Sequence, residues 1–257
     1  MTGERTLPGI GAENYWFQRH VAEYRFAATV ARGRVLDAGS GEGYGTALLA
    51  GAAIAAGLDA DRQAVAHAAR AYPRAAFAVA DLCAIPIRAG SLDAVVCIQV
   101  IEHLHCAAGF VRACRRALSP GGILVVATPN RPTFTPGSAV NPFHVHEYDA
   151  SELQGLLGTA FDRVHLYGLR HGPRLALIDR LLGEPVPRRL IRGGWAGTPS
   201  WVRSHLRGIG PRSFRIAPAR PTDLDLLAVC GGVRRGARPG ERSKRLRPRS
   251  EPPKGRT

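Results

Sequence analysis

Residues 35–46 read VLDAGSGEGYGT, and this stretch decides the fold. Two apolar residues lead into Asp37, glycine then recurs at every second position from 39 to 45, and the helix-forming run TALLA follows. Glycine has no Cβ, so a ligand can approach its backbone, and it tolerates the positive φ that a tight turn needs. The stretch therefore predicts a buried parallel strand that ends in a ligand-binding turn.

The glycine spacing excludes the usual dinucleotide-binding turn. That turn requires Gly-x-Gly-x-x-Gly, but counting from Gly39 the third position is Tyr44, and counting from Gly41 it is Thr46. The spacing is instead acidic-x-Gly-x-Gly-x-Gly.

The next block, residues 52–68, reads AAIAAGLDADRQAVAHA and predicts a second strand ending at Asp59. A carboxylate at such a strand tip can accept hydrogen bonds from both hydroxyls of a ribose. The alternative is that Asp59 caps the helix that follows, but Asp61 is better placed for capping. We therefore assign Asp59, with the adjacent Ala60, to ribose binding.

Three further blocks follow in order. A third strand ends at Asp81, with Leu82 beside it. An Ile-Pro-Ile segment precedes Asp93 and the strand AVVCIQ, and the turn SPGG at 119–122 precedes ILVVATPN. Apolar strands that alternate with helical segments indicate a doubly wound, parallel α/β sheet.

Over residues 35–157 these blocks resemble class I S-adenosylmethionine-dependent methyltransferases. The resemblance implies a Rossmann-like seven-stranded sheet with the last strand antiparallel, and S-adenosyl-L-methionine as cofactor. It places Asp37 near the methionine amino end and Asp81 with Leu82 at the adenine. The full set of cofactor residues that it implies is Asp37, Gly39, Ser40, Gly41, Gly43, Asp59, Ala60, Asp81, Leu82 and Gln99.

A narrower resemblance is to actinobacterial methyltransferases that modify the oligosaccharide of the redox cofactor mycofactocin. The segments that carry it are ENYWFQRH, VLDAGSGEGYG, ATPNRPTFTPG, NPFHVHEY and YGLRHGPRL. Residues 183–212 match nothing in that group. The resemblance implies O-methylation of a hydroxyl on a sugar-containing small molecule or glycoconjugate.

The segment after the fourth strand, residues 99–104, reads QVIEHL. It lacks the Asn/Asp-Pro-Pro-aromatic loop of enzymes that methylate amines of bases. Some quinone-pathway O-methyltransferases, which it resembles, hold a metal here with Glu-x-x-Glu-His. Gln99 replaces the first glutamate, and an amide is a poorer ligand for a hard cation than a carboxylate. We therefore predict no metal, with Glu102 and His103 as weak candidates that could equally form the first turn of a helix.

His144 and His146 are the candidate catalytic bases, because they lie beyond the fifth strand, on the side of the sheet where ligands bind. If the segment is extended, the two side chains point the same way. Histidine can remove the proton that a hydroxyl loses during methyl transfer. The alternative is that both only order the loop.

The chain divides into three parts by composition. Residues 1–32 predict a helical lid with Tyr15, His20 and Tyr24 as contacts to the cofactor, although core packing is the commoner use of such aromatics. Residues 33–232 form the methyltransferase domain, with an insert at 171–221 that contains Trp195 and Trp201 and serves as the acceptor lid. Residues 233–257 are predicted to be a disordered basic tail.

The net charge of +15 suggests a nucleic-acid partner until its location is considered. The tail from Arg234 carries ten Lys/Arg and two Glu, or +8, which leaves +7 for the rest. A basic extension without function is the simpler interpretation, so a nucleic-acid partner is not expected. An RNA or protein methyltransferase that uses this tail, and a non-catalytic domain that binds S-adenosylmethionine, remain the alternatives.

The five cysteines contain no Cys-x-x-Cys pair and fall mostly in apolar or helical segments. We expect reduced packing residues rather than a disulfide or a zinc site. The sequence shows neither a transmembrane run nor an apolar secretory leader, so a cytoplasmic protein is expected.

Overall fold

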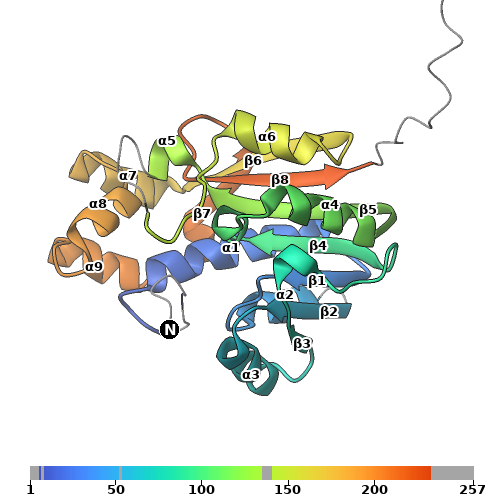
Figure 1. Ribbon diagram of the computed structural model, residues 1–257. Helices are drawn as coiled ribbons and strands as arrows, with labels where there is room; N and C mark the ends of the chain where they lie inside the picture. The colour runs from blue at the N-terminus through green and yellow to red at the C-terminus, as the bar shows by residue number, and fades with distance from the viewer. Residues whose placement is uncertain (1–5, 7–8, 52–53, 135–140, 233–257) are drawn as a thin grey trace, which may run out of the picture.

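The computed structural model describes residues 6, 9–51, 54–134 and 141–232 (Figure 1). The predicted basic tail, residues 233–257, lies outside the described residues, as does most of the stretch before residue 9. The described residues form one eight-stranded sheet in the order β3-β2-β1-β4-β5-β8-β6-β7.

The strands comprise five parallel ones followed by an antiparallel region. Strands β3, β2, β1, β4 and β5, in this order across the sheet, are parallel to one another. Strand β8 is antiparallel to its neighbours β5 and β6, and β7 is antiparallel to β6. Their bounds are β1 Arg34–Ala38, β2 Ile54–Asp59, β3 Ala76–Val79, β4 Leu92–Ile98, β5 Leu118–Pro129, β6 Arg163–His171, β7 Phe214–Pro218 and β8 Asp225–Gly231. The predicted Rossmann-like methyltransferase sheet is confirmed.

Strand β7 is one more strand than the sequence predicted, and it comes from the insert. Strand β6 runs on to His171, which leaves a free edge that Phe214–Pro218 covers, with Gly168 opposite Ala217. An uncovered edge exposes unpaired backbone groups, so pairing satisfies them.

Two layers of helices cover the sheet (Figure 1). The buried clusters place α1, α2 and the insert helices α7, α8 and α9 on one face, and α4 with α6 on the other. The helix bounds are α1 Asn14–Val30, α2 Tyr44–Ala50, α3 Arg62–Ala71, α4 Ala107–Ala117, α5 Arg131–Phe134, α6 Ala150–Gly158, α7 Pro173–Leu182, α8 Val186–Gly193 and α9 Ser200–Arg207. The short helices are η1 Leu82–Ala84, η2 Ile101–His103 and η3 Pro211–Ser213.

The core lies along the two central strands. Val95 and Val96 of β4 and Val125 and Val126 of β5 are fully buried, because helices cover both faces. This rigid centre fixes the carboxyl ends of β1, β2 and β4, from which the loops of the candidate site emerge. None of the helices in the described part of the chain has the length and apolar character needed to cross a membrane.

Candidate functional site

The glycine-rich turn closes tightly over the end of β2. The amides of Gly39 and Ser40 both donate to the Leu58 carbonyl, at 2.8 and 2.9 Å. Gly39 has φ +86°, and a Cβ built there would collide with the side chain of Val100. Only glycine fits at this position, so the backbone of the turn stays open to a ligand.

A cavity of about 440 Å³, the first cavity, lies beside this turn, and its size suits a nucleoside-containing ligand. Eight of the ten residues predicted to bind the cofactor line it: Gly39, Ser40, Gly41, Asp59, Ala60, Asp81, Leu82 and Gln99. The other two, Asp37 and Gly43, are not in its wall.

Asp61 caps α3 as the sequence predicted, whereas Asp59 holds the glycine turn. Asp59 accepts hydrogen bonds from the amides of Gly41 at 2.8 Å and Asp61 at 2.9 Å, so it ties the glycine turn to the start of α3. The Asp61 carboxylate caps α3 by accepting from Gln63 and Ala64. Asp59 also lines the first cavity.

Asp37 lies behind the cavity wall, fully buried. Its oxygens accept from the hydroxyl of Tyr24, at 3.1 Å, and from that of Thr46, at 2.6 Å. Burial raises the pKa of Asp37 to about 7, although both hydroxyls oppose the shift. Gly43 has a packing role, since a Cβ there would lie 2.6 Å from Ala68 Cβ.

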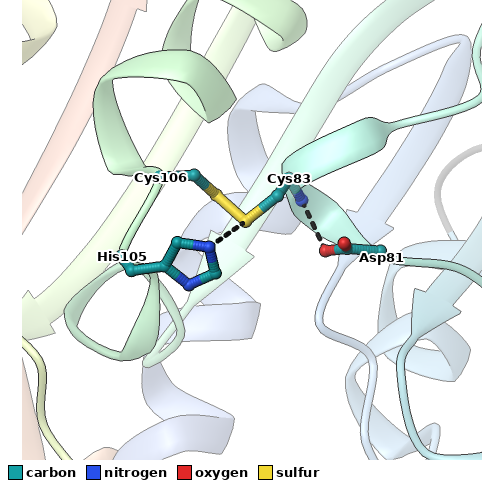
Figure 2. Close-up of a disulfide and its surroundings, with 4 residues drawn as sticks. All are labelled: Asp81, Cys83, His105 and Cys106. Carbon is teal, nitrogen blue, oxygen red and sulfur yellow. Dashed lines mark hydrogen bonds between the residues drawn. A yellow bond between two sulfur atoms is a disulfide. The ribbon is translucent and has the colours of Figure 1, made fainter.

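Asp81 leads to a disulfide that the sequence analysis did not predict (Figure 2). The Asp81 carboxylate accepts from the Cys83 amide at 2.8 Å, and Cys83 is bonded to Cys106. The expectation of five reduced cysteines is therefore wrong for this pair. The 23-residue separation hides the pairing, because it depends on η1 folding against the start of α4. The remaining cysteines, Cys97, Cys114 and Cys230, are free and buried, as expected.

A second cavity, of about 420 Å³, adjoins the first. Thr6, His20, Gln99 and His103 line both. Much of the remaining wall is aromatic or polar: Trp16, Arg19, Glu102, Phe134, Asn141, His144 and Trp195. The insert contributes Ile191 and Trp195 to this wall, whereas Trp201 is 48% exposed and lies elsewhere.

His144 and His146 do not share a side, because the chain bends at Val145. The amides of Val145 and His146 both donate to the Glu102 carbonyl, which an extended segment would not allow. The His144 side chain is only 5% exposed and lines the second cavity, and its Nδ1 lies 2.9 Å from Glu147 Oε1. His146 is 49% exposed, lies near Glu152 and lines neither cavity. Only His144 can contact a ligand there.

Glu102, His103 and His144 lie together, with their ligand atoms within 4.8 Å of one another. Glu102 is buried and accepts from the Thr128 hydroxyl at 3.0 Å, while His103 Nδ1 lies 2.8 Å from the Phe143 carbonyl. Their types suit a divalent cation. Gln99 does not join them, because its amide nitrogen points to Glu23 and Asp225 instead.

Sequence reasoning missed the buried charge cluster formed by Arg19, Glu23 and Asp225. Arg19 Nε and Nη2 donate to the two oxygens of Asp225, and all three side chains are at most 1% exposed. Arg19 and Glu23 are four residues apart on one face of α1, which is the one sequence signal that pointed to them. Of the predicted lid residues, His20 and Tyr24 line the first cavity, whereas Tyr15 is buried against His171.

Comparisons with known proteins agree with this geometry. A family described as "Methyltransferase domain" matches residues 36–126. A probable S-adenosylmethionine-dependent methyltransferase of Mycolicibacterium smegmatis is 42% identical over 241 residues, which cover 89% of this chain and 93% of the relative. One of Mycobacterium tuberculosis is 46% identical over 242 residues, covering 89% and 88%. The crystal structure of a possible histamine N-methyltransferase from Thermotoga maritima matches with a TM-score of 0.61 at 12% identity, over 84% of this chain and 91% of that one.

The chain belongs to the S-adenosylmethionine-dependent methyltransferases. Its cofactor is S-adenosylmethionine.

Proposed function

We propose that this enzyme methylates a hydroxyl of a sugar-containing small molecule or oligosaccharide in the cytoplasm. The observation that carries the proposal is the second cavity, which shares four wall residues with the first and contains a buried His–Glu pair. Aromatic walls with a few convergent polar groups suit a ligand that has both apolar faces and hydroxyls. S-adenosylmethionine would occupy the first cavity, with Asp59 at the ribose, Asp81 at the adenine and Gln99 at the boundary.

His144 is the base in this proposal. Glu147 accepts from Nδ1–H, and the Asn141 amide lies 3.1 Å from Nε2, so the lone pair is on Nε2. An acceptor hydroxyl that replaces the Asn141 amide would donate to Nε2 and lose its proton there as its oxygen attacks the methyl group. In-line alignment in a cavity that excludes water would supply most of the rate.

Three of the five segments that carry the mycofactocin resemblance, ENYWFQRH, ATPNRPTFTPG and NPFHVHEY, line the second cavity. ENYWFQRH supplies Trp16 and Arg19 to its wall, and NPFHVHEY supplies Asn141 and His144. This convergence supports a glycan acceptor, with the mycofactocin oligosaccharide as the first to test. Extract treated with isotope-labelled S-adenosylmethionine and the enzyme should contain a labelled glycan by mass spectrometry; label only in RNA or protein would contradict the proposal.

We propose that transfer needs no metal, since Gln99 is committed to the buried carboxylates. Turnover should therefore survive exhaustive chelation. Loss that magnesium restores would assign a cation to Glu102, His103 and His144.

Two histidine variants test the base directly. His144→Asn should lower kcat about a hundredfold and abolish the acid limb of the pH–rate profile, with cofactor affinity retained. His146→Asn is the matched control, because it lies in the same loop outside both cavities, and it should stay near wild-type kcat. Equal, mild losses in both variants would assign the loop histidines a structural role.

A further inference from the structure

Gln99 has an unusual backbone at the boundary of the two cavities. Its φ is +55°, and it is the one non-glycine residue with positive φ in the part of the chain that the structure describes. It directly follows β4 and lines both cavities. Backbone strain of this kind concentrates at functional sites, where the surrounding structure enforces it.

Two buried carboxylates fix the orientation of the Gln99 amide. Its Nε2 donates to Glu23 Oε1 at 3.0 Å and to Asp225 Oδ1 at 3.3 Å. Asp225 also accepts from Arg19, so it is an acceptor and requires the NH₂ group on its side. Oε1 then turns the other way. Oε1 makes no hydrogen bond with the described residues, and it is not one of the buried polar atoms that lack a partner. It is therefore exposed to the cavities that Gln99 lines.

Glu23 completes the arrangement as a neutral acid. It is fully buried, and its Oε2 has no hydrogen-bond partner in the described part of the chain. Burial, reinforced by Asp225, raises the pKa of Glu23 well above its usual range. With Oε2 protonated, Glu23 is neutral, so the cluster carries one positive and one negative charge, and Glu23 Oε1 still accepts from Gln99.

The methionine part of S-adenosylmethionine brings an α-ammonium group that needs acceptors. Asp37, placed there by family resemblance, lies behind the wall and accepts from Tyr24 and Thr46. We infer that Glu23 is a positioning residue that orients the Gln99 amide, so that Gln99 Oε1 accepts a hydrogen bond from this ammonium. The inference rests on the proposed cofactor site in the first cavity.

Calorimetric titration with two ligands tests this on the full chain. S-adenosylhomocysteine carries the ammonium, whereas 5′-methylthioadenosine lacks the amino acid but keeps the adenosine. Glu23→Met, which has similar length but no acceptor, should weaken S-adenosylhomocysteine about tenfold and leave 5′-methylthioadenosine within twofold. Glu23→Gln keeps an oxygen that can accept from the Gln99 amide, so it should keep both affinities within twofold of wild type.

Three results would overturn the inference: unchanged S-adenosylhomocysteine affinity in Glu23→Met, equal loss of both ligands, or a Glu23→Gln variant that loses as much as Glu23→Met. If Glu23→Met does not fold, Gln99→Met removes Oε1 itself and must give the same selective loss. The titrations contain no methyl acceptor, so their outcome does not depend on whether the enzyme methylates a sugar. A mistaken cofactor site would instead appear as normal binding of both ligands in Asp59→Ala.

Discussion

We propose that Asp59 serves two functions at the tip of β2. Its carboxylate holds the Gly41 amide and the Asp61 amide, and it lines the first cavity. The same oxygens that shape the turn are therefore available to a ribose, since each can accept more than one hydrogen bond.

Asp59→Ala should weaken S-adenosylmethionine binding by about 1.5–3 kcal/mol, through loss of charge-assisted hydrogen bonds. The control is Asp61→Ala, which removes the α3 cap and should lower Tm without lowering the affinity for the cofactor. Isothermal calorimetry distinguishes the two, and unchanged affinity in a folded Asp59→Ala variant would refute the ribose role.

Asp37 should give the enzyme a characteristic dependence of stability on pH. Its pKa is about 7 in the folded protein against 3.8 ordinarily, so between these values the folded state holds a proton that the unfolded state releases. Stability from this group is therefore full below about pH 4 and is lost as pH rises to about 7. The loss is at most about 4 kcal/mol.

Asp37→Asn cannot ionise, so its stability should decline less than that of wild type between pH 5 and pH 8. Urea unfolding at both values measures the difference. Parallel behaviour of the two proteins would mean that Asp37 ionises normally.

For single residues, the sequence predicts the geometry that neighbours in the chain determine. The glycine spacing and the Asp59/Asp61 pair indicated their own geometry, because each lies within a single strand–turn–helix unit, β1–α2 for the first and β2–α3 for the second. The sequence did not predict which residues pair in the buried cluster, because Arg19 and Asp225 are 206 residues apart and Gln99 and Glu23 are 76 apart. Such contacts depend on how α1 crosses the sheet.

At the scale of elements, the Cys83–Cys106 disulfide joins two loops that both reach the first cavity (Figure 2). One loop carries Asp81 and Leu82, and the other carries His103 and Leu104. His105 Nε2 lies 3.7 Å from Cys83 Sγ, where a protonated imidazole would stabilise a departing Cys83 thiolate.

Reduction by a dithiol should destabilise the protein by about 3 kcal/mol, the value expected for a crosslink across a loop of this length. Reduction should also weaken cofactor binding, because the disulfide no longer fixes the loop of Asp81 and Leu82, where we propose that the adenine binds. Thermal melts and cofactor titrations with and without dithiothreitol measure both effects. Cys83→Ser should have the Tm and cofactor affinity of the reduced protein, and dithiothreitol should change neither. If dithiothreitol left both values of the wild type unchanged, the prediction would be wrong.

The element order was accessible from sequence, whereas two elements were not. Strand β7 has the short sequence FRIAP within a long insert and forms because the edge of β6 is free. The bend at Val145 separates His144 from His146, which an extended segment would have kept on one side. In both cases a tertiary neighbour overrides the local pattern.

At the scale of the molecule, the site gathers segments from most of the chain. Helix α1, the loops after β1, β2, β3 and β4, and the loop after α5 all line the first cavity. The second cavity adds the insert through Ile191 and Trp195. We propose that the insert contacts the acceptor, since it contributes to the second cavity and not to the first.

The shared wall of Thr6, His20, Gln99 and His103 has a kinetic consequence. A cofactor in the first cavity covers these residues and becomes part of the surface that the acceptor meets. Substrates should thus add in a compulsory order, cofactor before acceptor, and products should leave in reverse. S-adenosylhomocysteine should inhibit competitively against S-adenosylmethionine and noncompetitively against the acceptor, and acceptor binding to the cofactor-free enzyme would exclude this order.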